Sequence, residues 1–360
     1  MFDSENGDFD IQKKHINDKG EYVITAGLTG NGVLGKTDVK AKIFDENTIT
    51  IDMFGYAFLR QFKYKIVTHA RVFSLIPKIK FSKNIGLVIT SALGFLPPLF
   101  GYENMCSWNK IKDLSMKLPT KNGKIDLEFM ESFVAELEAQ RVAELEAYLN
   151  VTGLKDYKLN DEEIKAIDNL EKVKWHEFKM GDLFERIKTK KLPYKAKELP
   201  KEPTDNCILP LLTSSFMNQG LNYYAPETNA TVLKNVISIP SNSDVYRSYY
   251  QSREFSVLSD AYAIKWKNKE IELSPNGYLF SVSCINKVTD LPIYSYKNKL
   301  GGWNVVKNKY IKLPVDSNGK IDFNYMENLT QAIKKLVIKD VVIYSDKKFK
   351  VTKDVLKYTK

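Results

Sequence analysis

The chain has 360 residues, 43% of them hydrophobic and 12% aromatic, which is enough for two well-packed globular domains. Its three cysteines, Cys106, Cys207 and Cys284, lie far apart, which argues against a zinc site and fits a reduced cytoplasmic protein. The formal net charge is +10, but residues 126–149 carry a net −6, so the rest of the chain carries +16. This excess either indicates a polyanionic partner or merely solubilises a lysine-rich surface.

The first 122 residues are predicted to form a module of mixed strands and loops. Three β-rich runs, at 21–26, 47–54 and 65–76, are separated by Gly, Asn and Asp turn residues. The most apolar run, 85–100, is too short for a membrane span and contains two prolines, so we expect it to be buried and expect no membrane partner. The run 84–95 is either a short buried helix or a strand, because its periodicity does not decide between the two.

A long spacer helix is predicted over residues 123–150. An Asn-Gly turn precedes Asp126, which can cap the helix. The apolar residues that follow recur with the 3-4-3 spacing of a coiled-coil seam. A polar linker, 151–172, then joins this helix to a second module at 173–318.

A second long helix, over residues 319–346, is predicted to close the second module. Its stripe has the same spacing, so we expect the two helices to pair as an antiparallel coiled coil. Residues 347–360 contain six lysines and one aspartate and are predicted to form a mobile basic tail. The predicted fold class is therefore α+β, with two tandem globular modules that are each followed by a long helix.

The two modules are diverged copies of one sequence, and such repeats decide the fold. Residues 108–119 read WNKIKDLSMKLP and residues 303–314 read WNVVKNKYIKLP, at an offset of 195; the phrase NGKID follows at an offset of 196. Upstream the match is weaker: THARVFSL at 68–75 parallels SDAYAIKW at 259–266, at an offset of 191. The copies differ most in their front loops, as expected for surface loops.

The second module opens with WHEFKMGDLFERI at 175–187, and the counterpart of this phrase in the first module would lie before Met1. We therefore expect the first module to lack its opening element. Either another chain supplies that element or the protein is truncated, and the sequence does not decide between the two.

Residues 30–37 read GNGVLGKT, which fits both G-x4-G-K-[ST] and G-x-G-x-x-G. In a nucleotide site the glycines would expose backbone amides to phosphate, and Lys36 would neutralise it. Two features favour an ordinary β-turn instead. The next strand-like run follows too soon for a helix, and the matching loop of the second module, SSFMNQG at 214–220, has neither pattern. Nucleotide binding through Gly30–Thr37 is kept as an alternative function.

Five phrases occur in the same order as in one known family. They are VITAGLTGNG (23–32), VTHARVF (67–73), FKMGDLFE (178–185), VVKNKYIKLP (305–314) and NGKIDFNYME (318–327). Together they resemble the specificity (S) subunit of Type I restriction–modification systems, and similar modules occur in Type IIB specificity subunits. The resemblance covers nearly the whole chain, and its order and duplication make it fairly specific.

The resemblance implies a DNA sequence-specificity subunit that is not itself an enzyme. Each module would be a target-recognition domain reading one half of a bipartite site in double-stranded DNA. The paired helices would hold the modules apart and dock methyltransferase (modification) subunits, which a restriction/translocase subunit could join. The chain itself would hold no cofactor, since S-adenosylmethionine would be bound by the methyltransferase subunits. A duplicated protein-binding scaffold is the remaining alternative.

DNA contacts are expected in two pairs of loops, at 28–36 and 53–65 in the first module and at 213–224 and 241–255 in the second. Lys and Arg hold phosphates, while Arg, Asn, Gln and Ser reach base edges. The candidates of the first module are Lys36, Arg60, Gln61, Lys63 and Lys65. Those of the second are Ser214, Ser215, Asn218, Gln219, Asn242, Tyr246, Arg247, Tyr249, Gln251 and Arg253.

Overall fold

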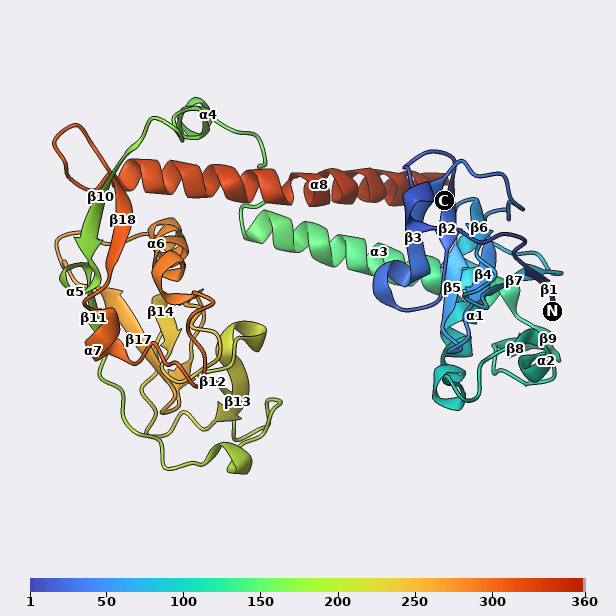
Figure 1. The fold of residues 1–360 in the computed structure, drawn as a ribbon, viewed down its shortest axis with the longest axis horizontal. Helices are drawn as coiled ribbons and strands as arrows, with labels where there is room; N and C mark the ends of the chain where they lie inside the picture. The colour runs from blue at the N-terminus through green and yellow to red at the C-terminus, as the bar shows by residue number, and fades with distance from the viewer. Residues whose placement is uncertain (359–360) are drawn as a thin grey trace. The chain divides into compact units, whose positions relative to one another are not determined.

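The structure is a computed structural model, which describes the backbone of residues 1–358 and the side chains of residues 1–350. The chain divides into two compact units. Unit 1 comprises Met1–Tyr148 together with the residues from Ser345 onward, and unit 2 comprises Leu149–Tyr344. Each unit combines small β-sheets with helices (Figure 1).

Unit 1 contains two main sheets. The four-stranded sheet is antiparallel throughout and has the order β1 (Phe2–Asn6), β7 (Phe73–Pro77), β4 (Thr48–Ile51), β5 (Ala57–Arg60). The three-stranded sheet has one antiparallel and one parallel pair, in the order β3 (Val33–Thr37), β2 (Glu21–Ile24), β6 (Tyr64–Ile66). The remaining elements are α1 (Lys83–Ala92), α2 (Trp108–Ile111), the hairpin of β8 (Thr120–Lys121) and β9 (Lys124–Ile125), and α3 (Leu127–Val151).

The core of unit 1 lies between the four-stranded sheet and α1. All four residues of β4, with the sequence TITI, are buried, and β-branched side chains favour such a strand. Ile49 and Ile51 pack with Ile85 and Ile89 of α1. The run that fitted either a helix or a strand is therefore a helix, N-capped by the Ser82 side chain.

Unit 2 repeats this architecture and adds to it. Its four-stranded antiparallel sheet has the order β11 (Phe184–Arg186), β17 (Ala261–Trp266), β14 (Val236–Pro240), β15 (Tyr249–Gln251). Its three-stranded sheet has the order β13 (Leu221–Ala225), β12 (Leu209–Leu212), β16 (Ser256–Val257). The additional antiparallel pair joins β10 (Lys174–Lys179) to β18 (Tyr310–Val315), which are far apart in the sequence. The helices are α4 (Asp161–Asp168), α5 (Met180–Leu183), α6 (Pro275–Thr289), α7 (Trp303–Val306) and α8 (Phe323–Tyr358).

The strands of the two main sheets correspond one to one between the units. The orders β1-β7-β4-β5 and β11-β17-β14-β15 match, as do β3-β2-β6 and β13-β12-β16. Ile49 pairs with Leu75, and Ile237 pairs with Ile264 in the same place. This register aligns Leu75 with Ile264 at an offset of 189, so the offset of 191 expected for that stretch is wrong by two residues.

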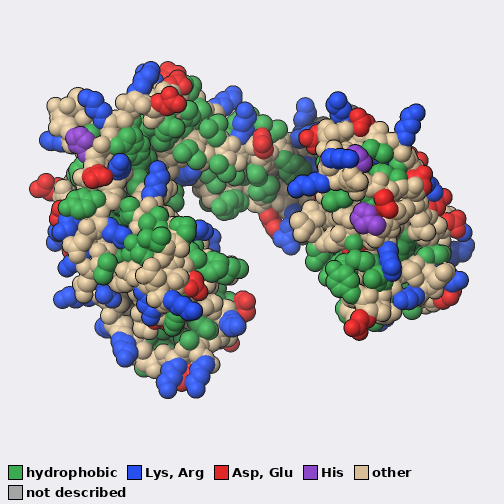
Figure 2. All heavy atoms as spheres, viewed as in Figure 1, with side chains coloured by type: hydrophobic (Ala, Val, Ile, Leu, Met, Phe, Trp, Pro, Cys, Tyr) green, Lys and Arg blue, Asp and Glu red, His purple; other side chains and the backbone are tan. Residues whose placement is uncertain are grey.

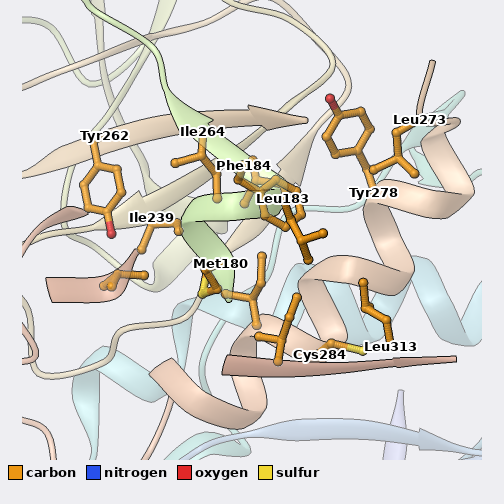
Figure 3. Close-up of a cluster of buried hydrophobic side chains, with 14 of the residues drawn as sticks. Met180, Leu183, Phe184, Ile239, Tyr262, Ile264, Leu273, Tyr278, Cys284 and Leu313 are labelled. Atoms are coloured by element: carbon orange, nitrogen blue, oxygen red, sulfur yellow. The ribbon is translucent and has the colours of Figure 1, made fainter. Parts of the chain in front are cut away.

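The opening element of unit 2 is part of its core. Met180 and Leu183 of α5 and Phe184 of β11 are buried against Leu313 and Cys284 (Figure 3). In unit 1, Phe2 pairs with Pro77 as Phe184 pairs with Trp266, so Phe2 takes the place of Phe184. The described residues of unit 1 therefore have no counterpart of β10 and α5.

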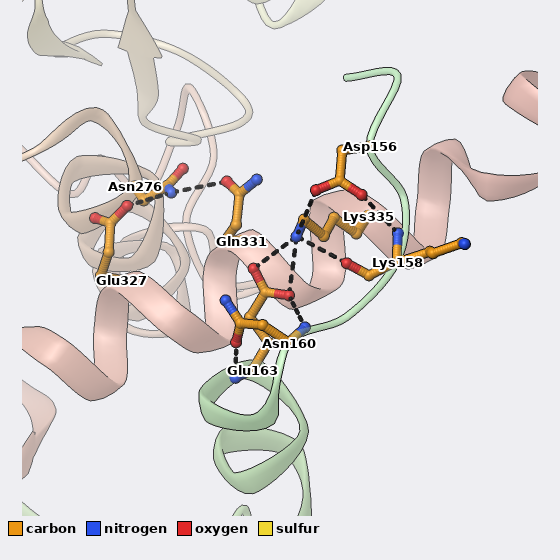
Figure 4. Close-up of polar contacts among 8 residues, drawn as sticks. All are labelled: Asp156, Lys158, Asn160, Glu163, Asn276, Glu327, Gln331 and Lys335. Atoms are coloured by element: carbon orange, nitrogen blue, oxygen red, sulfur yellow. Dashed lines mark hydrogen bonds and ion pairs between the residues drawn. The ribbon is translucent and has the colours of Figure 1, made fainter. Parts of the chain in front are cut away.

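Each closing helix is fixed to its own module by an equivalent set of hydrogen bonds. In unit 2 the Glu327 carboxylate of α8 accepts from the Ser274 hydroxyl. It also accepts from Asn276 Nδ2 at 2.6 Å (Figure 4). In unit 1 the Glu131 carboxylate of α3 accepts from the Ser82 hydroxyl and, at 2.9 Å, from Asn84 Nδ2. Both glutamates belong to the repeated phrase that predicted the helices.

The predicted linker, residues 151–172, lies within unit 2 and contains a helix, α4, that the sequence analysis did not specify. Helix α4 is anchored on α8 by Lys335, whose Nζ lies 3.0 Å from Glu163 Oε1 and donates to the Lys158 carbonyl at 2.9 Å (Figure 4). Both side chains of this ion pair are buried. The neutralising partner is necessary, because an isolated charge is costly to bury.

The two long helices begin and end close to the predicted positions at three of their four ends. Helix α3 spans Leu127–Val151 and α8 begins at Phe323. Helix α8 then continues to Tyr358, so the prediction of a separate tail from residue 347 is wrong for the described backbone. Residues 359–360 lie outside the described residues.

Candidate nucleic-acid interface

Each unit carries a turn of the same backbone shape inside its three-stranded sheet. Turn 1 (Thr29–Gly32) connects β2 to β3, and turn 2 (Met217–Gly220) connects β12 to β13. The φ angles are 57°, 54° and 71° at Gly30, Asn31 and Gly32, and 47°, 55° and 95° at Asn218, Gln219 and Gly220. Three consecutive left-handed residues explain why Gly and Asn dominate both sequences.

Each turn is held by one side chain from the neighbouring strand. Arg60 of β5 donates from Nη2 to the Asn31 carbonyl at 2.9 Å and from Nε to Thr50 Oγ1 at 2.8 Å. Gln251 of β15 donates from Nε2 to the Gln219 carbonyl at 3.1 Å and to the hydroxyl of Ser238, the equivalent of Thr50, at 3.0 Å. Arg60 and Gln251, which were both predicted to contact DNA, therefore hold the turns in position.

Burial corrects three of the predicted DNA contacts. Arg60 is 2% exposed, and burial lowers the pKa of its guanidinium to about 10. Lys65 is also buried, and its Nζ donates to the carbonyls of Thr37 and Val39 at 3.1 and 2.6 Å. Tyr246 is buried beside Tyr294, with ring centroids 6.1 Å apart. None of these three side chains can reach DNA from its position here.

The two predicted loops of unit 2 form one continuous surface. The Ser243 hydroxyl donates to the Ser214 carbonyl at 2.8 Å, and the Tyr249 hydroxyl donates to the Phe216 carbonyl at 3.1 Å. Together with Gln251, these bonds join the segment that precedes turn 2 to the loop after β14. The candidates that remain solvent-accessible on this surface are Ser214, Ser215, Asn218, Gln219, Arg247, Tyr249, Gln251 and Arg253.

Arg247 is the best-placed cation of this surface. Its Nε lies 2.7 Å from Asp290 Oδ2, and this hydrogen bond raises the pKa of the guanidinium. The carboxylate orients one edge of the guanidinium, while half of the side chain stays exposed. Asn242 is half-buried, and its Oδ1 has no hydrogen-bond partner among the described residues.

The surface of unit 1 is smaller once its buried candidates are removed. Gln61 is exposed, and Lys63 lies 3.4 Å from Asp45. Lys36 is half-buried in β3, with its ammonium 4.7 Å from the centre of the Tyr22 ring. Phe62 packs on the same ring, with centroids 4.4 Å apart. A cation over an aromatic pair is a surface that can contact a phosphate and a sugar or base.

Two exposed apolar side chains were missed by the sequence analysis. Leu28 and Phe216 immediately precede the two turns, at equivalent positions, and are 58% and 49% exposed. Met217 beside Phe216 is also exposed. Such residues can act as apolar wedges against nucleic-acid bases.

The phosphate-loop interpretation of GNGVLGKT is wrong. Strand β3 spans Val33–Thr37, so Lys36 and Thr37 lie within a strand. A phosphate loop requires a helix that begins at this point and directs its amides at the ligand.

Within the part of the chain that the structure describes, no His, Cys, Asp and Glu side chains group as metal ligands. None of the described helices could cross a membrane.

Basic side chains accompany these surfaces. On the visible face, Lys and Arg side chains lie on both units, and on unit 2 several lie over the end that carries β12 and β13 (Figure 2). Two copies of one fold, each presenting a turn with its own side chains beside basic groups, define a duplicated recognition protein.

The chain belongs to the family of the Type I restriction modification DNA specificity domain, whose model matches residues 1–147 and 172–342. It is therefore a specificity subunit of restriction–modification systems, with a role in DNA sequence recognition and without catalytic activity of its own. A curated relative is the Type II restriction enzyme BgcI specificity subunit S.BcgI of Heyndrickxia coagulans. It is 22% identical over 331 residues, which cover 91% of this chain and 90% of the relative.

One solved structure supports the same fold. The S subunit of a Type I restriction–modification system from M. genitalium matches with a TM-score of 0.59 and 16% identity, over 98% of this chain and 91% of that one. The HsdS subunit from Thermoanaerobacter tengcongensis is less similar, with a TM-score of 0.31 and 12% identity over 94% of this chain and 89% of that one.

Proposed function

We propose that the two units read the two halves of a bipartite sequence in double-stranded DNA. The observation that carries this proposal is the pair of turns. Their backbones have the same left-handed shape and the same tether from the neighbouring strand, yet their side chains differ at almost every position. Two copies of one recognition fold whose contact side chains have diverged would read two different sequences.

The side chains of the two surfaces differ, which supports recognition of different bases by the two units. Unit 2 offers the amides of Asn218 and Gln219 with the guanidinium of Arg247, groups that suit adenine and guanine edges in the major groove. Unit 1 offers Gln61 and Lys63, with Lys36 over its aromatic pair. Leu28 and Phe216 would stack against bases or sugars beside each turn.

The two long helices would pair as an antiparallel coiled coil that spaces the half-sites. Within unit 1, Lys348 of α8 lies 3.8 Å from Glu138 of α3, and the Ser345 hydroxyl donates to Glu146 at 3.1 Å. The residue numbers rise along one helix as they fall along the other, as in an antiparallel pair. The 25 residues of α3 span about 37 Å at ~1.5 Å per residue, close to one DNA turn of ~34 Å.

The same helices would dock methyltransferase subunits. Ile333, Leu336 and Val337 of α8 are large apolar side chains that are at least half exposed. Leu137 of α3 stands at the position equivalent to Ile333 and is also exposed. An exposed apolar side chain at one equivalent place on each helix is consistent with docking of the same kind of partner on both. S-adenosylmethionine would be bound by those partners, and a restriction/translocase subunit could join the complex.

The proposal is tested by footprinting the chain on DNA together with its methyltransferase subunits. We expect two protected patches about one helical turn apart, with an unprotected stretch between them. Inserting four helical residues in both α3 and α8, about 6 Å, should widen the gap by about two base pairs. A single continuous patch, or a gap that the insertion leaves unchanged, would contradict the bipartite reading.

A further inference from the structure

Asp52 is a buried carboxylate that binds two segments of unit 1 at once. It follows β4 directly and is 2% exposed. Its Oδ1 accepts from the amides of Phe54 and Tyr56 at 2.9 and 3.0 Å, and its Oδ2 accepts from the amide of Gly27 at 2.8 Å. Three amide donors satisfy a charge that would otherwise be costly to bury. The same carboxylate therefore shapes its own loop and holds a segment 25 residues earlier in the sequence.

Asp52 and Arg60 hold the two ends of the segment that leads into turn 1. The Asp52 carboxylate binds the amide of Gly27. The Arg60 guanidinium binds the carbonyl of Asn31 at 2.9 Å. Both charged side chains are buried, so both bonds are shielded from water. Residues 27–31 are thus fixed at each end by a group of opposite charge.

The space beside the same segment is open. A Cβ added at Gly27 or at Gly30 would have no neighbouring atom within 4 Å. The Leu28 side chain between them is 58% exposed. A segment that is held at both ends and has open space beside it can present its side chains to a ligand without rearranging.

Unit 2 makes the same connection with different groups. The Ser243 side chain is buried, and its hydroxyl accepts from the amide of Val245 at 3.1 Å and donates to the carbonyl of Ser214 at 2.8 Å. Ser214 lies one residue before the equivalent of Gly27, at the offset of 188 that relates the two turns. A carboxylate that accepts from an amide in unit 1 is thus replaced by a hydroxyl that donates to a carbonyl in unit 2. The connection is kept although the residue type differs, so it serves something that the two units share.

We infer, on the basis of the proposed function above, that Asp52 and Ser243 are positioning residues for DNA reading. Each fixes the segment before its turn against the loop that follows the buried strand, so that side chains of both segments meet DNA in one arrangement. A preorganised surface does not shift to accommodate a wrong base pair, whereas contacts to phosphates tolerate such a shift. Loss of either connection therefore reduces discrimination between bases and leaves the affinity for unrelated DNA almost unchanged.

The atoms of the carboxylate define the sharpest variant. In Asp52→Asn the amide oxygen can keep both bonds inside the loop, but the amide nitrogen then faces the Gly27 N–H, and two donors do not bond. The volume hardly changes, so the substitution breaks the bond between the two segments and little else. Ser243→Ala is the corresponding variant of unit 2. Ile49→Val is the matched control, because it trims a fully buried side chain of β4 and weakens unit 1 without touching either segment.

Sequence selection from random duplex DNA, by the chain with its methyltransferase subunits, tests the inference. The wild-type selection defines the two half-sites, and duplexes with one substituted base pair in either half-site then measure discrimination. We expect Asp52→Asn to lower discrimination at least tenfold in one half-site, and Ser243→Ala to do so in the other. Affinity for an unrelated duplex should change less than twofold in both variants. Ile49→Val should leave discrimination in both half-sites unchanged.

Hydrogen exchange of the free chain shows whether the substitution broke its bond. In Asp52→Asn the Gly27 amide should exchange at least tenfold faster, while the amides of β4 keep their protection. A Gly27 amide that exchanges as in the wild type would refute the connection itself. If Asp52→Asn does not fold, Ser243→Ala carries the test, because its effect is confined to unit 2.

The outcomes separate this inference from the proposed function. Wild-type discrimination in Asp52→Asn with a released Gly27 amide, or in Ser243→Ala, would overturn the inference and leave bipartite reading intact. An equal loss of affinity for cognate and unrelated duplexes would also overturn it, since that loss reports a general weakening of the surface. A wild-type selection without two half-sites would overturn the proposed function and the inference together.

Discussion

The two units use the same residue types for some equivalent hydrogen bonds and different residue types for others. The bonds that attach each closing helix, Ser82 and Asn84 to Glu131 and Ser274 and Asn276 to Glu327, use the same residue types. The tethers of the two turns use different residues, Arg60 and Gln251, for the same two bonds. The helix attachments therefore keep the same residue types in both units. The turns keep the same backbone shape but use different residues, so their contact side chains can differ between the units.

The largest expected effect concerns the ion pair that only unit 2 has. Lys335→Ala removes one partner of a buried pair and should lower the free energy of unfolding of unit 2 by about 3–5 kcal/mol, because the Glu163 carboxylate stays buried. Ala139 stands at the equivalent place in unit 1. Denaturant unfolding, followed by labelling of Cys284 in unit 2 and Cys106 in unit 1, separates the two units.

Burial raises the pKa of both thiols to about 11, so labelling below that pH reports unfolding. The double variant Lys335→Met with Glu163→Gln serves as the control and should recover most of the lost stability, because no buried charge remains. If Lys335→Ala shifted the labelling of Cys106 and Cys284 to lower denaturant concentration by the same amount, the ion pair would not stabilise unit 2 specifically.

The next effect tests whether the turn tethers are interchangeable. Arg60→Ala should cost unit 1 about 2–3 kcal/mol, since hydrogen bonds from a charged group are lost and the Thr50 hydroxyl and the Asn31 carbonyl lose a partner. Arg60→Gln should cost less, because a glutamine makes both bonds in unit 2. Urea unfolding measures both variants, and equal losses would mean that the charge, not the tether, matters.

A smaller effect is expected on DNA binding by unit 2. Arg247→Ala should weaken binding to the cognate site by about 1–3 kcal/mol and relax specificity in one half-site only. Asp290→Asn is the matched control, because it keeps the guanidinium but weakens the bond that orients it. Titration of labelled DNA at fixed salt measures both, and unchanged affinity of Arg247→Ala for the cognate site would remove it from the interface.

The smallest effect concerns phosphate contacts in unit 1. Lys36→Ala should weaken binding equally for cognate and unrelated DNA and should lower the slope of log K against log salt by about 1. The comparison with Arg247→Ala then distinguishes a contact to phosphate from a contact to a base. A selective loss of the cognate sequence in Lys36→Ala would instead place this lysine at a base edge.

Much of the scaffold could be predicted from the sequence. The repeated phrases place both closing helices, and the absence of the GNGVLGKT pattern from the second copy identified a turn rather than a nucleotide site. The β-rich run at 47–54 predicted the buried strand β4. Local pattern suffices in these cases, because the residues that form each element are neighbours in the chain.

The positioning residues could not be predicted in the same way. Arg60 and Gln251 differ in residue type, and their offset of 191 differs from the 188 that relates the turns, so no alignment pairs them. Lys65 is basic and lies in a predicted loop. Its side chain nevertheless turns inward and donates to two carbonyls that lie 26 and 28 residues away in the sequence. The anchor between Lys335 and Glu163 joins residues 172 positions apart. Contacts over such distances depend on the assembled fold.

The central claim is that each unit reads its own half of one DNA site. The most direct measurement is selection of preferred sequences from random duplex DNA by the chain with its methyltransferase subunits, repeated with Asn218→Ala and with Gln61→Ala. We expect two short defined half-sites around an undefined spacer, with each variant relaxing a different half. One contiguous motif, or two variants that relax the same half, would contradict the account.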